Sequence, residues 1–385
     1  MGELKKTGEK KTQYFDYTLL AIVIFLMCFG LVMLYSTSSY SAQMKFGDSM
    51  YYFKRQVIFS AIGFVGMLVI AKFNYHIYGR LAKLSYIVAF ILMALVQTPL
   101  GIERNFSRRW IKLPFGFQMQ PSEVAKIAIV LFIPLLICKA GKQIREWKKT
   151  IYIFAIGAAA AGGVMFLTDN LSTAVICMGM VCIMIFVAHP KTAPFLLLGG
   201  GAATVVAAGI AILSKLVANA SDMKGFRLRR ILVWLEPEKY LDDGGFQVMQ
   251  GLYAVGSGGF FGKGLGNSAQ KMLIPEAQND MILSIICEEL GVFGALVLLG
   301  MFAILLYRLV FVAKNAPDLY GSLMVTGIFA HIALQVTLNV MVVLNVIPTT
   351  GITLPFVSYG GTSVLFLMAE MGLALSVSNR IKFEE

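Results

Sequence analysis

The sequence is poor in charged residues, which make up 14% of its 385 residues. An average soluble domain has about 25%. Paired cysteines are also missing, because all five cysteines fall in apolar runs without a CxxC pair, and the three histidines are scattered. These deficits exclude a disulfide scaffold and a Cys/His metal site. Hydrophobic residues reach 58% and the mean hydropathy is +0.75, which exclude a disordered chain and a cytosolic enzyme.

Long apolar runs predict an all-α polytopic membrane protein with about ten transmembrane helices, since a span needs roughly 20 mostly apolar residues. The runs cover residues 17–35, 56–71, 84–100, 124–138, 151–167, 173–188, 193–213, 281–307, 321–346 and 354–377. We treat residues 1–385 as a single membrane domain. One long connection, 214–280, is too charged and glycine-rich to span. A connection of this length is usually functional or has structure of its own.

Positive charge predicts the orientation in the membrane. With ten spans, 17 Lys and Arg lie on the side of the two tails and seven lie in the short loops opposite. Cytoplasmic loops carry the excess of Lys and Arg. Both tails, 1–16 and 378–385, are therefore predicted to be cytoplasmic, and 214–280 is predicted to be a large extracytoplasmic loop between helices 7 and 8. No small-residue cleavage site follows the first apolar run, so that run is interpreted as a signal anchor.

Two clusters of cations lie on the outer side, where topology depletes them. Arg108, Arg109 and Lys112 surround Trp110, and a second cluster, 227–230, precedes Trp234. Solvated loop charges and interfacial tryptophan anchors are the simpler interpretation. Arginine in two such clusters instead favours an anionic ligand at the membrane surface, because its planar fork binds phosphate oxygens bidentately.

Ionisable residues near or inside the spans are candidates for function. Glu123 and Lys126 are three residues apart and can pair on one helix face. Asp280 starts the eighth span, where it can equally be an ordinary helix cap. Glu288 lies about 12 Å deeper on a continuous helix and about 80° around it, so it can face the same cavity. Glu370 lies within the tenth span and needs a partner.

Several motifs follow one another along the chain: RRWI (108–111), QPSEVAK (120–126), GKGLGNS (262–268), QK (270–271), PEA (275–277), EELG (288–291), PTTG (348–351), LPF (354–356) and SYGG (358–361). Taken in order, they resemble the SEDS family (shape, elongation, division and sporulation), and its FtsW/SpoVE branch more than RodA. Two segments depart from the family pattern. QNDM (278–281) replaces His-Thr-Asp-Phe but keeps Asp280, and Asp169-Asn170 replaces the usual Pro-Asp, so no role is assigned to these two residues.

The resemblance implies a peptidoglycan glycosyltransferase that polymerises lipid II, an undecaprenyl-pyrophosphate-linked disaccharide-pentapeptide, on the outer face of the bacterial cytoplasmic membrane. By resemblance, Asp280 is the general base that deprotonates the 4-hydroxyl of the acceptor sugar. The candidate pyrophosphate ligands are Arg108, Arg109, Lys112, Arg227, Arg230 and Lys271. The polar residues expected to shape the cavity are Glu123, Lys126, Gln247, Gln250, Glu288 and Ser358. No cofactor or dedicated metal site is marked, although Mg²⁺ or Mn²⁺ can assist at a pyrophosphate.

The resemblance also implies partners: the lipid-linked nascent glycan, a class B penicillin-binding protein of the FtsI type, other division proteins at the septum, and membrane lipids, but no nucleic acid. Three alternatives stay open at this point. The first is a lipid II flippase, because charges inside spans also mark transport pathways. The others are a non-catalytic division scaffold and another lipid-linked sugar transferase, such as an O-antigen ligase. Division and sporulation roles are not separated by these motifs.

Overall fold

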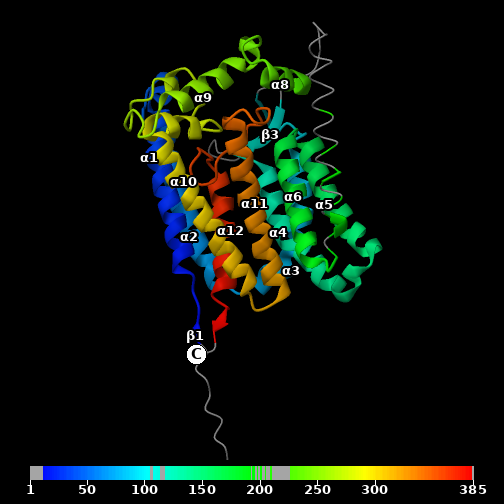
Figure 1. The fold of residues 1–385 in the computed structure, drawn as a ribbon. Coiled ribbons are helices and arrows are strands. Elements are labelled where there is room, and N and C mark those ends of the chain that lie inside the picture. The colour runs from blue at the N-terminus through cyan, green and yellow to red at the C-terminus, as the bar shows by residue number, and fades with distance from the viewer. Residues whose placement is uncertain are drawn as a thin grey trace, which may run out of the picture.

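In the computed structural model, residues 12–104, 107–112, 118–191 and 226–383 are described, together with 193–195, 197, 200, 201, 204 and 209. Within this part of the chain the protein is a bundle of long apolar helices (Figure 1). Eight of them are long and apolar enough to cross a membrane: α1 (Tyr17–Phe46), α2 (Tyr51–Lys72), α3 (Tyr75–Leu95), α4 (Pro121–Ala140), α5 (Trp147–Leu167), α6 (Leu171–Ala188), α10 (Ile282–Lys314) and α11 (Leu319–Val343). The prediction of a helical polytopic membrane protein is thus confirmed.

The last helix, α12 (Ser363–Ser378), is shorter than the predicted tenth span, 354–377. Residues 347–362 are irregular, because Pro348 and Pro355 lack the N–H that a helix needs and Gly351 and Gly361 adopt positive φ. Apolar residues such as Leu354 hide this interruption from a hydropathy scan. Most of the seventh predicted span, 193–213, lies outside the described residues, so the count of ten stays a prediction.

Both ends of the described chain lie at the same end of the bundle (Figure 1). Strand β1 (Thr12–Gln13) pairs antiparallel with β5 (Lys382–Phe383). Next to this pair, the carboxylate of Asp16 accepts from the backbone N–H of Leu19 at 2.9 Å and pairs with Arg308 at 2.9 Å. The short helix η2 (Gly141–Arg145) is a turn after α4. The two predicted tails therefore share one side, and its assignment as cytoplasmic rests on the charge distribution.

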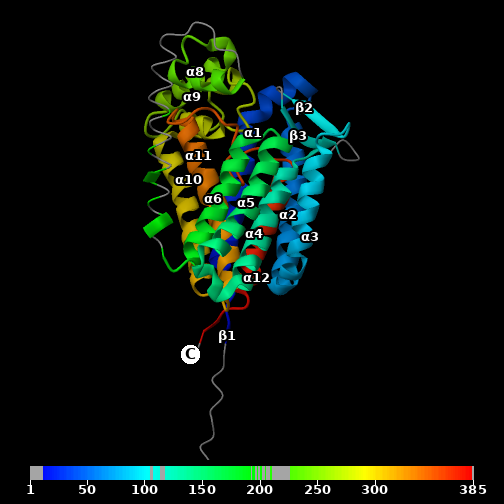
Figure 2. The same ribbon diagram turned by 90° about the vertical axis from the view of Figure 1, so that its right-hand side faces the viewer.

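The opposite end of the bundle carries the remaining elements (Figures 1 and 2). They are β2 (Gly101–Arg104), β3 (Ser107–Lys112), β4 (Gln118–Met119), α8 (Phe226–Leu235), η3 (Leu241–Asp243), α9 (Gly245–Ser257) and η4 (Gln270–Met272). The strands form an antiparallel sheet in the order β2-β3-β4, which the sequence analysis did not predict. The described part of the 214–280 connection has helices of its own, as its length suggested.

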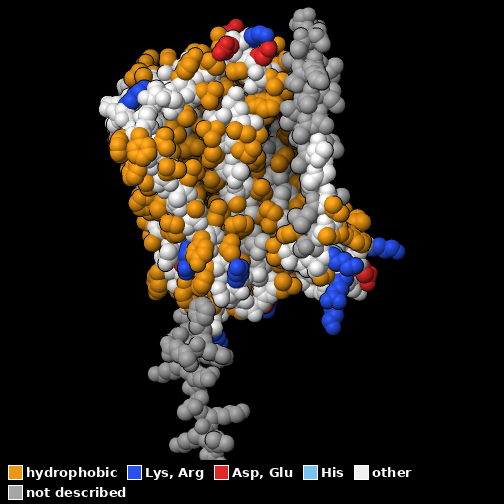
Figure 3. All heavy atoms as spheres, in the orientation of Figure 1, with side chains coloured by type: hydrophobic (Ala, Val, Ile, Leu, Met, Phe, Trp, Pro, Cys, Tyr) orange, Lys and Arg blue, Asp and Glu red, His pale blue; other side chains and the backbone are white. Residues whose placement is uncertain are grey.

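Between these ends, apolar side chains cover the face shown in Figure 3, and charged side chains gather toward its two ends. Ile62 and Val65 of α2 are 56% and 61% exposed, and Phe293 of α10 is 52% exposed. A contiguous apolar surface of this kind suits contact with lipid chains rather than water. The composition and the surface therefore agree on an integral membrane protein.

Helix α10 is kinked at Gly291, whose φ of 71° and ψ of −172° are non-helical. A Cβ at this position would lie 2.3 Å from the carbonyl oxygen of Phe260, so only glycine fits. At the kink, the backbone carbonyls of Glu288 and Glu289 accept hydrogen bonds from the preceding loop instead of from the next turn of the helix. The backbone N–H of Lys263 donates to the carbonyl of Glu288 at 2.9 Å, and that of Gly264 donates to the carbonyl of Glu289 at 2.9 Å. The kink thereby fastens the loop onto the start of the helix.

The expectation that Glu288 shares a cavity with Asp280 on one continuous helix needs correction. Asp280 precedes α10, and the fully buried carboxylate of Glu288 holds the loop. It pairs with Lys263 at 2.6 Å, accepts from the hydroxyl of Ser268, and accepts from the N–H of Ala269 at 3.2 Å. Its neighbour Glu289 is also buried, so both carboxylates serve the loop.

Candidate functional site

Asp280 stands at the outer end of the bundle, in the turn before α10, and is half-buried. Gln247 of α9 donates to its Oδ1 at 3.4 Å, and Asn339 of α11 donates to its backbone carbonyl at 2.9 Å. The N-cap residue of α10 is Met281, and no side chain caps the helix. Asp280 therefore does not cap α10, and its carboxylate is available for other contacts.

Burial raises the pKa of the Asp280 carboxyl to about 6. The neighbouring charge of Glu276 raises this pKa further, whereas Arg230 and the hydrogen bond from Gln247 lower it. A carboxylate that is deprotonated at neutral pH yet close to its pKa is well suited to accept a proton. This property makes Asp280 the strongest candidate for acid–base chemistry in the described outer segments.

Arg109 and Arg230 come from distant parts of the chain, on β3 and α8. Arg109, on β3, donates from Nη2 to the carbonyl of Asp169 at 3.2 Å, and Arg230, on α8, donates from Nη1 to the carbonyl of Thr349 at 3.4 Å. Burial and the charge of Arg230 lower the pKa of Arg109, although an arginine stays protonated at neutral pH. Arg230 thus lies close enough to act electrostatically on both Arg109 and Asp280.

Arg109 and Arg230 are like charges that act on each other. Within the described residues, the buried Nε of Arg109 has no hydrogen-bond partner. Half-buried guanidinium groups such as these suit phosphate oxygens, because they can donate charge-assisted hydrogen bonds. We call Arg109, Arg230 and Asp280 the outer cluster. Within it, the charge of Arg230 acts on both other residues.

The other predicted cations lie elsewhere or outside the described part. Arg108 precedes Arg109 on β3, so its side chain points to the opposite face of the strand, where it pairs with Glu103 at 3.2 Å. Lys112 ends β3 and is exposed. Arg227 lies on α8, but its side chain is outside the described residues. Their roles at a pyrophosphate stay predictions.

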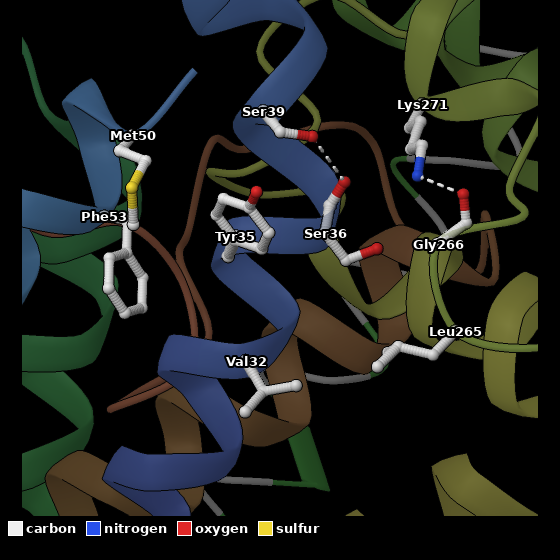
Figure 4. A pocket seen from close by; sticks show the side chains of 9 residues that line it. All are labelled: Val32, Tyr35, Ser36, Ser39, Met50, Phe53, Leu265, Gly266 and Lys271. Carbon is white, nitrogen blue, oxygen red and sulfur yellow. Dashed lines mark hydrogen bonds between the residues drawn. The ribbon is translucent and has the colours of Figure 1, made fainter. Parts of the chain in front are cut away.

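Lys271 belongs to a different neighbourhood (Figure 4). Its ammonium donates to the carbonyl of Gly266 at 2.7 Å and pairs with the buried Glu289 at 3.2 Å, and the same carboxylate accepts from Ser36. It lines a hollow of about 470 Å³ between α1, the start of α2 and the loop. The other lining residues are Val32, Tyr35, Ser36, Ser39, Met50, Phe53, Leu265 and Gly266. The positive charge of Lys271 is therefore already matched by Glu289.

A second polar cluster is buried among α4, α11 and α12. Lys126 pairs with Glu123 at 2.9 Å, as predicted, and also contacts Nε2 of His331 at 2.8 Å. Nδ1 of His331 lies 2.6 Å from the carboxylate of Glu370. Glu370 thus has the partner that the sequence analysis required. His331 was missed because a lone histidine in an apolar run has no motif around it.

The irregular segment 347–362 contacts both the outer cluster, through Arg230, and the buried cluster around Lys126, through Gln335. Carbonyls of a non-helical segment inside a membrane protein must be satisfied by other protein groups. Side chains from three helices, α6, α8 and α11, donate to them: Arg230 to Thr349 at 3.4 Å, Ser172 to Thr350 at 2.9 Å, Asn339 to Ile352 at 2.8 Å and Gln335 to Thr353 at 2.9 Å. This segment contains the PTTG, LPF and SYGG motifs, so in the structure these motifs lie where side chains of several helices converge by hydrogen bonding.

The remaining predicted polar residues support these elements. Ser358 accepts the N–H of Leu354 at 2.8 Å and so shapes a turn in 347–362. Gln250 lies on α9, three residues after Gln247. Trp234 donates from Nε1 to the carbonyl of Asn345 at 2.9 Å, which ties α8 to the end of α11. In the part of the chain that is described, no three His, Cys, Asp or Glu side chains come together as a metal site.

Comparison with known proteins matches nearly the whole chain. Stage V sporulation protein E of Bacillus subtilis (strain 168) is 38% identical over 371 residues, which cover 96% of this chain and 98% of that protein. A probable peptidoglycan glycosyltransferase FtsW of Geobacter sp. (strain M18) is 34% identical over 375 residues, which cover 97% and 99%.

Solved structures agree with these sequence relatives. A chain from a peptidoglycan synthase complex, studied for how it coordinates polymerization and crosslinking, matches with a TM-score of 0.74 and 27% identity over 94% of this chain and 97% of that one. The rod shape determining protein RodA of Thermus thermophilus has the same fold, with a TM-score of 0.64, 22% identity, and coverage of 94% and 96%. Residues 17–382 match the model of the FtsW/RodA/SpoVE family, described as cell cycle proteins. With the order of motifs and the fold in agreement, the chain belongs to this FtsW/RodA/SpoVE family, also called SEDS.

Proposed function

We propose that this protein is a peptidoglycan glycosyltransferase that polymerises lipid II into β-1,4-linked glycan at the outer face of the bacterial plasma membrane. The observation that carries the proposal is the outer cluster, in which the charge of Arg230 acts on Arg109 and on the Asp280 carboxyl, whose pKa is about 6. The name of a relative that is 34% identical to this chain, probable peptidoglycan glycosyltransferase FtsW, supports the same activity.

The proposed reaction joins the acceptor oxygen to the donor sugar in one inverting step. Asp280 takes the proton of the acceptor 4-hydroxyl as its oxygen bonds to C1 of the donor. The bond between C1 and the pyrophosphate oxygen breaks, and the electron pair leaves with undecaprenyl pyrophosphate. An α-linked donor then gives a β-1,4 bond. A second carboxylate is not required as an acid, because pyrophosphate is a stable leaving group, whereas a glycosidase needs a carboxylate pair.

The two arginines are proposed to bind the pyrophosphate before and during the reaction. Negative charge grows on the leaving oxygens, and fixed cations that are partly shielded from water stabilise it most strongly. Mg²⁺ is commonly held by substrate phosphates with one or two carboxylates. If Mg²⁺ or Mn²⁺ takes part, we therefore propose that the pyrophosphate oxygens supply most of its ligands, since the described residues hold no cluster of three metal-binding side chains.

We further propose that the chain works at the division septum or in sporulation, with both termini cytoplasmic. Its proposed partners are a crosslinking penicillin-binding protein of the FtsI type and other division proteins. The match to a chain from a peptidoglycan synthase complex supports this part of the proposal. The lipid-linked nascent glycan serves as the second substrate.

One observation favours a flippase as the alternative function. Glu123, Lys126, His331 and Glu370 are all buried, and they form a connected polar path among the helices. Such groups are common in transport pathways. In the structure they are joined to one another and to the 347–362 segment, which also suits a rigid support for the outer cluster.

Reconstitution separates these functions. Purified protein in liposomes is supplied with lipid II, alone and with its transpeptidase, and glycan chains and lipid II on each leaflet are both measured. We expect glycan polymer when lipid II faces the outer cluster. Lipid II that crosses the bilayer without forming polymer would support the flippase instead, and neither product in both conditions would support a scaffold.

A further inference from the structure

Asn339 lies at the junction of the outer cluster and the 347–362 segment. It is fully buried on α11, and its Nδ2 donates to the backbone carbonyls of Asp280 at 2.9 Å and Ile352 at 2.8 Å. Both acceptors lie outside helices, so no helical hydrogen bond fixes them. A single amide group thus joins the candidate base to the segment that contacts Arg230.

The orientation of this amide is determined by its partners. Carbonyl oxygens only accept hydrogen bonds, so both contacts require the NH₂ group and not the oxygen of the amide. The Oδ1 of Asn339 is then buried without a partner in the described structure. Buried polar atoms without partners are rare and require an explanation. The explanation here is that a double donor is needed at this point, even though its own acceptor is left unsatisfied.

The carboxylate of Asp280 depends on this backbone contact. The hydrogen bond that Gln247 donates to this carboxylate is long at 3.4 Å, whereas the bond from Asn339 to the backbone carbonyl of Asp280 is 2.9 Å. The backbone of Asp280, rather than its side-chain partners, therefore sets where the carboxylate lies. Catalytic groups need to be held within about 0.5 Å of their productive geometry.

Asn339 is also the outermost member of a polar row on α11. His331, Gln335 and Asn339 are four residues apart and share one helix face. Gln335 contacts Nε2 of His331 at 2.8 Å and donates to Thr353 at 2.9 Å. The row thus links the buried Lys126 cluster to the 347–362 segment and, through Asn339, to Asp280.

From this geometry we infer that Asn339 is a positioning residue that sets the place of the Asp280 carboxylate relative to Arg230 and the bound pyrophosphate. The inference rests on the proposed function. Because Asn339 contacts no predicted pyrophosphate ligand, its loss should slow the chemical step and leave substrate binding nearly intact.

The test compares Asn339→Leu, Asn339→Gln and the Asp280→Asn/Asn339→Leu double variant. We expect Asn339→Leu to lower kcat about 10²-fold, the usual size of a small misplacement, with the KM for lipid II changed less than about threefold. Asn339→Gln keeps both donors and should recover part of the rate. In the Asp280→Asn background, Asn339→Leu should cause no further loss, because there is no base left to position.

Asn315→Leu is the matched control, since Asn315 donates to the carbonyl of Phe311 at 2.8 Å at the far end of α10 and should keep full activity. Thermal unfolding and lipid II binding are measured for every variant. A wild-type rate in Asn339→Leu overturns the inference. So does a loss that appears together with lower thermal stability or weaker lipid II binding, which would indicate a purely structural role. Absence of polymer from the wild type would instead count against the proposed function.

Discussion

Asp280→Asn is expected to lower the rate of lipid II polymerisation by about 10²–10⁴-fold, the usual contribution of a general base. Asparagine has nearly the same shape but cannot accept the proton of the acceptor hydroxyl. The half-buried position before α10 and the backbone contact with Asn339 do not depend on the carboxylate, so the variant should fold. Initial rates of glycan formation from lipid II, measured by gel or mass spectrometry, test this expectation.

Glu276→Gln is the matched control for Asp280→Asn. Glu276 is an exposed carboxylate four residues earlier, and its charge acts on Asp280. Its loss changes the local charge by the same amount without removing the proposed base. We expect this variant to keep its rate within a few-fold at neutral pH. Equal losses in the two variants would mean that negative charge in this turn, and not a proton acceptor at Asp280, is what matters.

Arg109→Ala and Arg230→Ala should each weaken lipid II binding. A hydrogen bond to a charged group contributes about 1.5–3 kcal/mol, which corresponds to roughly 10- to 100-fold in Kd. Burial and the charge of Arg230 both lower the pKa of Arg109, so the two guanidinium groups repel each other and a bound pyrophosphate should relieve this repulsion. Binding of lipid II to detergent-solubilised protein gives the Kd directly, and the Asp280→Asn background prevents turnover during the measurement.

Lys239→Ala is the control for the arginine variants. Lys239 is another outer cation, with 68% of its side chain exposed and an ion pair to Glu236 at 2.8 Å. Its removal lowers the outer positive charge without touching the outer cluster, so the Kd should stay within about twofold, as is usual for an exposed pair. Unchanged affinity in Arg109→Ala and Arg230→Ala would return both arginines to the role of ordinary loop charges.

Much of the fold was predictable because helices that cross a membrane must be long and apolar. Hydropathy located α5, α6 and α11 well, whereas α1 continues to Phe46, beyond the predicted end at residue 35. It missed the kink of α10 at Gly291, since a single glycine with positive φ does not lower the mean hydropathy of the surrounding residues enough to be noticed. It also placed residues 354–362 inside a span, because apolar residues such as Leu354 and Val357 mask the break made by Pro355 and by the positive φ of Gly361.

The candidate site was predictable only in part, because many of its contacts join residues that are far apart in the sequence. Motifs identified Asp280 and Arg109, the outer charge cluster identified Arg230, and in the structure the charge of Arg230 acts on the other two. Lys271 also lies in a motif, but its ion pair with Glu289 depends on the loop packing against the kink of α10, which the motif does not predict. Asn339 and His331 were missed because their roles depend on carbonyls and carboxylates far away in the sequence. Their spacing on α11 was the available signal.

The most direct test of the central claim, that Asp280 is the base, is the pH dependence of kcat/KM for lipid II. The carboxyl must be deprotonated to act, so with a pKa of about 6 the rate should rise tenfold per pH unit below this value and level off above it. Arg230 lowers this pKa, so in Arg230→Gln the inflection should move to higher pH. A rate that is independent of pH across this range in the wild type, or an inflection that survives unchanged in Asp280→Asn, would contradict the account.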